Sequence, residues 1–225
     1  MYEKPLPYGN PVFFEGQYKK DKVYPLYIQM ISCTGFKIKK NKIPTIQIKS
    51  NVYYKENEYL EESINTGEVI VLCMTNVDLE LALEHYEFYD LKYLSGWKFK
   101  SFDKLFKKYI DKWIEEKNQG TIEKNGGKRT RAKLMLNSLY GKFAKTMELK
   151  GKYPTLGDDD IIHYKFTQKT IVDGIYIPVA SFITSYAREK TIRTSQTIKD
   201  YSIQKYGKDL YYYSDTDSIH CRTFY

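Results

Sequence analysis

The chain has 225 residues, which at roughly 100–200 residues per domain corresponds to one or two domains with a hydrophobic core. Hydrophobic residues make up 42% of the chain and aromatic residues 16%, and these fractions exclude a disordered tail, a linker or a fibrous protein. The 36 basic and 28 acidic residues give a net charge of +8, so the composition favours nucleic acid or an anionic membrane over acidic small molecules as the partner.

The cysteine content and the hydropathy pattern indicate a reducing compartment and no membrane segment. The three cysteines are odd in number and too widely spaced for a C-x-x-C metal site or a disulfide framework. The longest apolar run, Val69–Met74, is much shorter than the ~20 residues of a membrane-spanning helix, and Met1–Pro7 lacks the apolar stretch of a signal peptide. We therefore expect no membrane anchor and a cytoplasmic location.

The first third of the chain has the pattern of β-strands. Tyr24–Ile31 is rich in Tyr, Leu and Ile, and Glu68–Met74 has the apolar character of a buried strand. Thr75 precedes Asp78 by three residues, which is the spacing of a capping box. This spacing predicts a short helix that starts after Thr75 and ends at His85.

Three further helices are predicted after His85. The first is predicted to start after Ser101, because apolar residues then recur at i, i+3 and i+4 with charged residues opposite. The pair Gly126-Gly127 separates it from a second predicted helix at Lys128–Lys145. A third helix is predicted at Phe182–Ile198.

Two strand pairs complete the predicted elements. An Asp173-Gly174 dipeptide between two apolar pairs is a strong signal for a hairpin turn. Leu210–Tyr213 predicts a strand that leads through an acidic turn into a returning strand at Ile219–Cys221. No internal repeat and no long linker divides the chain, so the sequence predicts one mixed module of the α+β class.

Most of the excess positive charge lies in one segment. Residues 124–150 contain eight basic residues and a single acid, Glu148, and so carry +7 of the net +8. On a helix, Arg129, Lys133, Asn137 and Tyr140 share one face, because they are three, four or eight residues apart. Two cations, an amide and an aromatic ring suit a nucleoside triphosphate, although a solvated basic helix with Tyr140 in the core has the same pattern.

A pair of carboxylates forms a second candidate site. Asp215 and Asp217 are separated by one residue, so in an extended strand or tight hairpin both side chains point to the same side. Magnesium ions prefer a few carboxylates together with substrate phosphates, and two such ions can catalyse an in-line displacement. A D-x-D surface turn without metal has the same sequence.

The two segments together resemble motifs of the family B DNA polymerases. Lys133–Gly141 resembles the K-x-x-x-N-S-x-Y-G motif, and Tyr213–Ser218 matches the Y-x-D-T-D-S motif, in the order that the family shows. Phe182–Arg188 is similar to the T-x-x-G/A-R segment of the protein-primed branch, which occurs in small tailed bacteriophages. Further stretches that look like this branch are Leu6–Gly9, Ile43–Lys49 and Asn76–Leu81.

The resemblance implies part of a right-hand polymerase, with palm and fingers segments and inserted β-rich subdomains. It assigns residues 1–100 to a palm insertion that engages terminal protein and DNA, and residues 101–145 to the fingers helices. Residues 146–178 would form a β-hairpin insertion implicated in processivity and strand displacement, and residues 179–225 a palm segment.

The resemblance also implies roles for individual residues. Asp215 and Asp217 would be catalytic and would bind two magnesium ions, or manganese in their place. The implied nucleotide-binding residues are Arg129, Lys133, Asn137, Tyr140 and Gly141, with Arg129 at a position where the branch often has a lysine. The implied DNA contacts are Ser138, Thr184, Arg188 and Tyr213. The implied partners are primer-template DNA, deoxynucleoside triphosphates and a terminal protein primer.

The chain lacks other features of the family. No stretch has the D-x-x-S-L-Y-P palm motif or the acidic exonuclease motifs, so we expect an internal piece of a larger polymerase from the cytoplasm of an infected bacterial host. Because one of the two principal metal-binding aspartates is missing, we expect little or no DNA synthesis by the isolated chain.

Other interpretations stay open. A non-catalytic nucleic-acid-binding or terminal-protein-binding module derived from a polymerase would need only the basic segment and tyrosines available for stacking. In a plain α+β domain, the acidic turn and the basic helix would be incidental. An RNA-directed polymerase would share the paired aspartates, but Tyr140 and Gly141 in their N-S-x-Y-G setting favour a DNA-directed enzyme. The three histidines have no partner at ligand spacing and receive no role.

Overall fold

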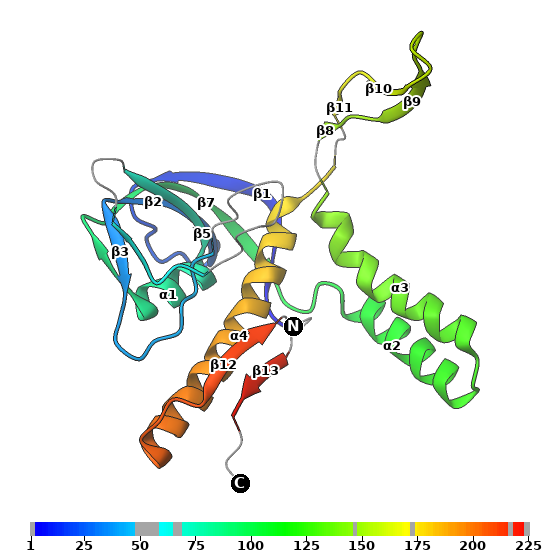
Figure 1. Cartoon of the computed structure of the whole chain (residues 1–225). Coiled ribbons are helices and arrows are strands. Elements are labelled where there is room, and N and C mark those ends of the chain that lie inside the picture. Colours follow the sequence, from blue (N-terminus) through cyan, green and yellow to red (C-terminus); the bar gives the residue numbers. More distant parts are fainter. Residues whose placement is uncertain are drawn as a thin grey trace. The chain divides into compact units, whose positions relative to one another are not determined.

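The computed structural model describes residues 3–47, 59–64, 69–145, 148–171, 174–215 and 218–222. The chain divides into two compact units (Figure 1). Unit 1 consists of residues 1–105 and 182–225, and unit 2 consists of residues 106–181. Helices and antiparallel strands occur in both units, which confirms the predicted α+β class.

The main sheet of unit 1 has four antiparallel strands in the order β1-β7-β2-β5. Their bounds are β1 Leu6–Glu15, β7 Lys92–Phe102, β2 Leu26–Cys33 and β5 Ile70–Thr75. The long strand β7 lies between β1 and β2 and pairs with both along most of its length. It therefore joins the N-terminal strand to the rest of the sheet.

A second, three-stranded sheet has the order β4-β3-β6, with bounds Glu62–Ile64, Gly35–Ile38 and Tyr86–Tyr89. Its core cluster contains Phe36, Ile46 and Tyr86, all almost fully buried. The Tyr86 hydroxyl accepts a hydrogen bond from the backbone N–H of Thr45 (2.8 Å) and donates one to the carbonyl of Leu60 (2.7 Å). The buried hydroxyl is thereby satisfied, as a polar group in a core must be.

Two helices and a strand pair complete unit 1. Helix α1 (Asn76–His85) starts as predicted, because the Thr75 side chain accepts a hydrogen bond from the N–H of Asp78. Helix α4 (Ile177–Tyr206) is longer than predicted at both ends and belongs to unit 1 from residue 182 onward. Strands β12 (Tyr211–Asp215) and β13 (Ser218–Cys221) pair as the sequence indicated. No helix in the described residues is long and apolar enough to cross a membrane.

The last residue of α1, His85, is a buried titratable group. His85 is 2% exposed, and its Nδ1–H donates a hydrogen bond to the carbonyl of Ile43 (2.7 Å). Burial lowers the pKa of His85 below its usual 6.5, so the folded protein holds the neutral ring while the unfolded chain takes up a proton. The stability that the neutral His85 contributes is present above pH 6.5 and is lost as the pH falls through the folded pKa.

We expect the free energy of unfolding, measured with urea, to fall between about pH 7 and about pH 5, and to fall less in the His85→Asn variant. An equal fall in the variant would contradict this assignment.

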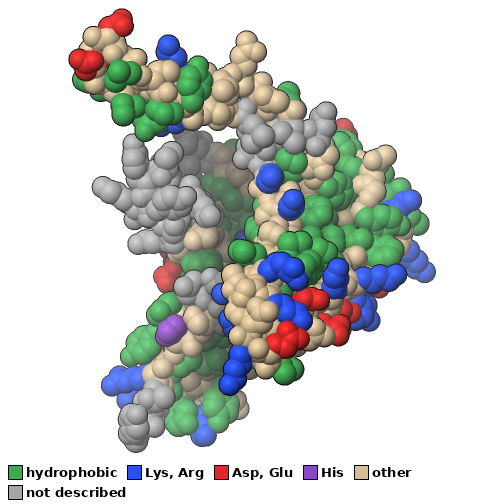
Figure 2. Space-filling view, turned by 90° about the vertical axis from the view of Figure 1, so that its right-hand side faces the viewer, with side chains coloured by type: hydrophobic (Ala, Val, Ile, Leu, Met, Phe, Trp, Pro, Cys, Tyr) green, Lys and Arg blue, Asp and Glu red, His purple; other side chains and the backbone are tan. Residues whose placement is uncertain are grey.

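Unit 2 contains two helices that run side by side, α2 (Lys107–Ile122) and α3 (Gly126–Phe143) (Figure 1). They are followed by a hairpin of two short antiparallel sheets. Strand β8 (Glu148–Leu149) pairs with β11 (Thr170–Ile171), and β9 (Lys152–Leu156) pairs with β10 (Ile162–Phe166). We call residues 148–171 the hairpin arm. At the top of Figure 2, acidic side chains gather at one end of this arm, which carries Asp158, Asp159 and Asp160.

The structure corrects two of the helix predictions. The first predicted helix begins at Lys107 instead of directly after Ser101, because residues up to Phe102 are held in β7 by pairing with β1. Gly126 and Gly127 are the first residues of α3 and not a separator. The helix starts there because the Asn125 side chain accepts a hydrogen bond from the N–H of Lys128 (3.0 Å) and caps it.

Two strand predictions are also corrected. Gly174 has a left-handed backbone (φ 82°), but residues 174–176 form no strand, and β11 pairs with β8 instead; Val172 and Asp173 lie outside the described residues. The hairpin turn lies at residues 157–161, between β9 and β10. The predicted buried strand Glu68–Met74 corresponds to β5, where Val71 is 53% exposed because only one face of this edge strand is covered.

Candidate nucleotide and nucleic-acid site

The basic face predicted on the second helix is present on α3 of unit 2. Arg129, Lys133 and Asn137 are exposed, and the Tyr140 side chain is 39% exposed, so Tyr140 is not a core residue. Helical spacing puts these four on one side of α3. We call them the cationic face of α3.

A neighbouring side of α3 is packed against α2. Ala132 is fully buried, and the Tyr109 hydroxyl on α2 donates a hydrogen bond to the carbonyl of Met135 (2.9 Å). The rings of Phe106 and Phe143 are in contact, with centroids 5.3 Å apart. This packing sets the rotation of α3, so that the cationic face lies beside the contact with α2, where the backbone of Arg129 itself approaches Gly120.

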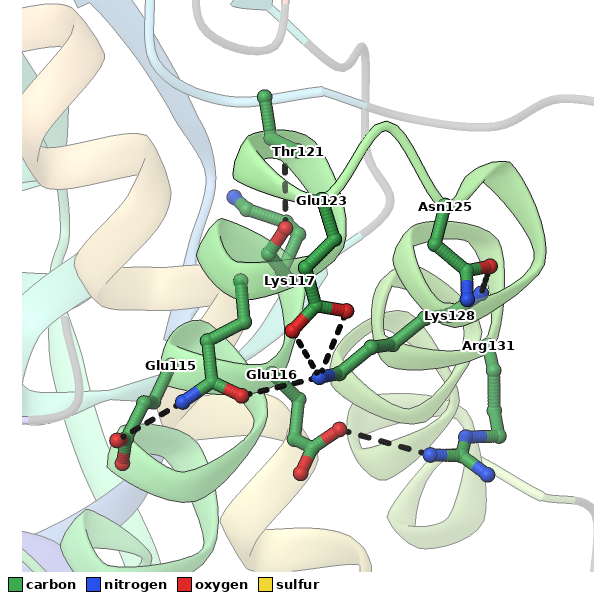
Figure 3. Close-up of polar contacts among 9 residues, drawn as sticks. Glu115, Glu116, Lys117, Thr121, Glu123, Asn125, Lys128 and Arg131 are labelled. Atoms are coloured by element: carbon green, nitrogen blue, oxygen red, sulfur yellow. Dashed lines mark hydrogen bonds and ion pairs between the residues drawn. The ribbon is translucent and has the colours of Figure 1, made fainter.

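Ion pairs divide the basic residues of α3 into two groups. The Lys128 ammonium donates hydrogen bonds to the carboxylate of Glu123 (3.1 Å) and to the side-chain oxygen of Gln119 (3.0 Å), and Arg131 lies 3.5 Å from Glu116 (Figure 3). No ion pair within the described residues engages Arg129 or Lys133. Of the four basic residues at positions 128–133, the two without an acidic partner are therefore those of the cationic face.

Two further residues of the K-x-x-x-N-S-x-Y-G motif, Ser138 and Gly141, lie outside the cationic face. The Ser138 hydroxyl donates a hydrogen bond to the carbonyl of Met135 (3.2 Å), so its proton is used within α3. Gly141 is exposed, and a Cβ atom at this position would meet nothing within 4 Å. Within unit 2, no packing requirement explains the glycine, and the open space beside it is accessible to a ligand.

The predicted DNA contacts on α4 lie in unit 1. Thr184 is half-buried, and the Arg188 guanidinium forms an ion pair with the Asp78 carboxylate. That carboxylate also accepts a hydrogen bond from the Ser185 hydroxyl (2.6 Å), which in turn accepts one from the Thr75 hydroxyl (2.8 Å). Arg188 is thus held against the start of α1. The local sequence pattern predicts only a capping role for Asp78, and its pairing with Arg188 over 110 positions has no local signal.

A cavity of about 420 Å³ borders this ion pair. Its polar lining includes Arg188 and Asp78 together with Thr45 and Gln47, and its apolar lining includes Ile46, Leu72 and Met74. Arg188 therefore lines the cavity while its guanidinium pairs with Asp78.

Strand β12, which ends at Asp215, and strand β13 are held together by an aromatic contact. The rings of Tyr213 on β12 and His220 on β13 stack with centroids 4.3 Å apart and planes 5° apart. Asp215 pairs with Ser218 across the two strands. Asp217 and the side chain of Asp215 lie outside the described residues. Within the described part of the chain, no three His, Cys, Asp or Glu side chains form a metal-binding group.

Comparison with known proteins agrees with the motifs. A family model described as DNA polymerase type B, organellar and viral, matches residues 1–225. The DNA polymerase of Bacillus phage Nf is 47% identical over 98% of this chain, and that of Streptococcus phage Cp-1 is 36% identical over 98%. The structure of phi29 DNA polymerase complexed with primer-template DNA and incoming nucleotide substrates matches 100% of this chain with a TM-score of 0.85 and 44% identity. This chain covers 36–37% of these three proteins, or about a third of their length.

Proposed function

The chain belongs to the type B DNA polymerases of organelles and viruses, and on this basis we propose that it supplies nucleotide-binding and metal-binding parts of a DNA-directed DNA polymerase. The proposed reaction is template-directed transfer of a nucleotide from a deoxynucleoside triphosphate to a primer. Primer-template DNA and deoxynucleoside triphosphates are the proposed ligands, by analogy with the phi29 complex that contains primer-template DNA and incoming nucleotide substrates. A terminal protein is the proposed primer.

The observation that carries the proposal is the cationic face of α3. Arg129 and Lys133 have no acidic partner among the described residues, whereas Lys128 and Arg131 on the same helix do. A triphosphate would satisfy these cations with charge-assisted hydrogen bonds. Asn137 and the half-exposed ring of Tyr140 would then border the sugar and base.

Divalent magnesium is the proposed metal, held by Asp215 and Asp217. The donor set fits, because carboxylate oxygens suit a hard cation, and the imidazole of His220 on β13 is engaged in the stack on Tyr213. When bound, two such ions would activate the attacking hydroxyl and stabilise the leaving oxygen. The chain's own part would be to supply the two carboxylates next to a strand pair, β12 and β13, that the Tyr213–His220 stack holds together.

Arg188 is the proposed contact to the primer or template backbone. Asp78 holds its guanidinium in place, and the cavity beside it leaves room for a phosphate. Thr184, on the preceding turn of α4, is proposed to contribute to the same surface. Ser138 and Tyr213 are also proposed DNA contacts, and both already have partners within the chain, because Ser138 donates within its own helix and Tyr213 stacks on His220.

The two groups of cations on α3 allow a controlled test of the triphosphate assignment. In the complete protein, we expect Lys133→Gln and Arg129→Gln each to raise the KM for deoxynucleoside triphosphate in primer extension by about 10-fold or more, since a hydrogen bond to a charged group contributes about 1.5–3 kcal/mol. Binding of primer-template DNA without nucleotide, measured by fluorescence anisotropy, should change little.

Lys128→Gln and Arg131→Gln are the matched controls. They remove the same charge from the same helix, but these cations already pair with acids of α2. We expect their KM values to stay within about twofold of the parent. Equal effects from both groups would show that only net charge matters, and no effect from Lys133→Gln would remove the triphosphate assignment.

A further inference from the structure

Tyr109 on α2 contacts α3 in a different way from the ion pairs between the two helices. Its hydroxyl donates a hydrogen bond to the backbone carbonyl of Met135 (2.9 Å). Met135 lies within the K-x-x-x-N-S-x-Y-G motif, two residues after Lys133 and two residues before Asn137. A side chain of α2 is thus bonded to the main chain of α3 between two residues of the cationic face.

The carbonyl of Met135 has other hydrogen-bond donors. Inside an α-helix each carbonyl accepts a hydrogen bond from the N–H four residues later, and α3 continues beyond Leu139, which is that residue. The Ser138 hydroxyl also donates to the same carbonyl (3.2 Å). The carbonyl would therefore stay hydrogen-bonded without Tyr109. What the Tyr109 hydroxyl adds is a connection between α2 and α3.

The Tyr109 side chain is held in place by packing. Its ring contacts Trp113 on the next turn of α2, with centroids 6.2 Å apart. The Trp113 ring in turn lies 5.9 Å from the guanidinium of Arg131 on α3. Since tyrosine has only two side-chain torsions, a packed ring leaves its hydroxyl oxygen little freedom. The position of this oxygen therefore follows the backbone of α2.

The other named contacts between the two helices are more adaptable. Lys128 and Arg131 pair with acids through long side chains, which can change rotamer and follow a moving backbone. The contact between Phe106 and Phe143 is apolar, and hydrophobic contact is not directional. A hydrogen bond to a backbone carbonyl constrains both a distance and an angle. Of these contacts, the bond from Tyr109 therefore constrains the middle of α3 most directly.

We propose that Tyr109 is a positioning residue for the incoming nucleotide, because its hydroxyl holds the stretch of α3 that carries Lys133 and Asn137. This role rests on the proposed function, in which these two side chains contact a deoxynucleoside triphosphate. Tyr109 touches no substrate and acts through the α3 backbone. Without the hydroxyl, the stretch would have to be ordered when the nucleotide binds, and part of the binding energy would be used for that ordering. The loss should therefore weaken nucleotide binding and leave the chemical step unchanged.

Tyr109→Phe tests the proposal, because phenylalanine keeps the ring beside Trp113 and removes only the hydroxyl. In primer extension by the complete protein, we expect the KM for deoxynucleoside triphosphate to rise roughly 3- to 10-fold, as for the loss of one neutral hydrogen bond. The kcat at saturating nucleotide should stay within about twofold of the parent. A merely structural role would instead reduce the amount of active protein, which lowers the apparent kcat and leaves the KM unchanged.

Two controls remove hydroxyl groups that donate to carbonyls outside the contact between α2 and α3. Thr121→Val removes the hydrogen bond from the Thr121 side chain to the carbonyl of Lys117 (3.1 Å), which lies within α2 (Figure 3). Tyr18→Phe removes a tyrosine hydroxyl of unit 1 that donates to the carbonyl of Tyr24 (2.8 Å). Both variants should keep a KM within about twofold of the parent, because neither hydroxyl holds α3.

The double variant Tyr109→Phe/Lys133→Gln shows whether Tyr109 acts through the cationic face. Independent residues give effects that multiply, whereas residues that act through one another do not. If Tyr109 positions Lys133, its hydroxyl matters less once the ammonium group is gone. The double variant should then raise the KM by less than the product of the two single effects. A rise equal to that product would contradict the positioning role.

Failure of the positioning role and failure of the proposed function give different results. If Lys133→Gln leaves the KM unchanged, the triphosphate assignment fails, and the role of Tyr109 fails with it. If Lys133→Gln raises the KM but Tyr109→Phe does not, the triphosphate assignment holds and the positioning role alone is wrong. The same conclusion follows if Tyr109→Phe lowers only the kcat.

Discussion

Replacing Asp217 with asparagine in the complete protein is expected to lower nucleotide incorporation by about 10³-fold or more, and Asp215→Asn should do the same. Asparagine has nearly the same size but no charge, so it would weaken the hold on both proposed metal ions while preserving the strand pair β12–β13. Primer extension with magnesium measures the loss. Affinity for primer-template DNA should stay nearly unchanged, because metal-dependent chemistry and backbone binding use different groups.

Asp209→Asn is the control for this prediction. Asp209 lies in the same part of unit 1, where its carboxylate is 3.0 Å from Lys199 and accepts a hydrogen bond from the N–H of Tyr211 (3.0 Å). Its loss removes one negative charge but no proposed metal ligand, so incorporation should stay within about twofold of the parent. Normal incorporation by Asp215→Asn and Asp217→Asn would show that the metal assignment is wrong.

Sequence patterns predicted the elements that are stabilised by contacts between residues close together in the sequence. Thr75 caps α1 through a contact three residues away, and the apolar strand before Asp215 pairs with the strand after it. The α3 face was also predictable, because helical spacing alone brings Arg129, Lys133, Asn137 and Tyr140 together. In each case the deciding contact lies within a few residues in the sequence.

Contacts between residues far apart in the sequence determine the features that local sequence patterns did not predict. Phe102 fits a helical stripe, but pairing with Leu6 keeps it in β7. The basic segment of α3 is uniform in sequence, yet Glu116 on α2 and Glu123, which follows α2, pair with Arg131 and Lys128. Family resemblance, and not periodicity, supplied the roles of the site residues, and those roles stay predictions.

Gly120→Ala is expected to displace part of the cationic face of α3, although Gly120 itself lies on α2. Gly120 is buried on α2, and a Cβ atom there would lie 2.7 Å from the backbone nitrogen and 3.1 Å from the Cα atom of Arg129. Backbone cannot rotate out of the way as a side chain can, so the first turns of α3 would have to move. We expect a loss of about 1–3 kcal/mol in the free energy of unfolding of the complete protein. Since Arg129 moves with that backbone, the KM for deoxynucleoside triphosphate should also rise.

Gly126→Ala separates this effect from glycine replacement in general. Gly126 is the first residue of α3, and an added Cβ atom would meet nothing within 4 Å. Because alanine favours a helix by up to about 1 kcal/mol over glycine, this variant should be as stable as the parent or more so, with an unchanged KM. If Gly120→Ala melts like the parent and keeps its KM while Arg129→Gln raises it, the close approach of α2 does not position Arg129. If Arg129→Gln also leaves the KM unchanged, the proposed contact of Arg129 with the triphosphate is wrong. The pair of variants thus tests the packing of α2 against α3 and the chemistry of α3 separately.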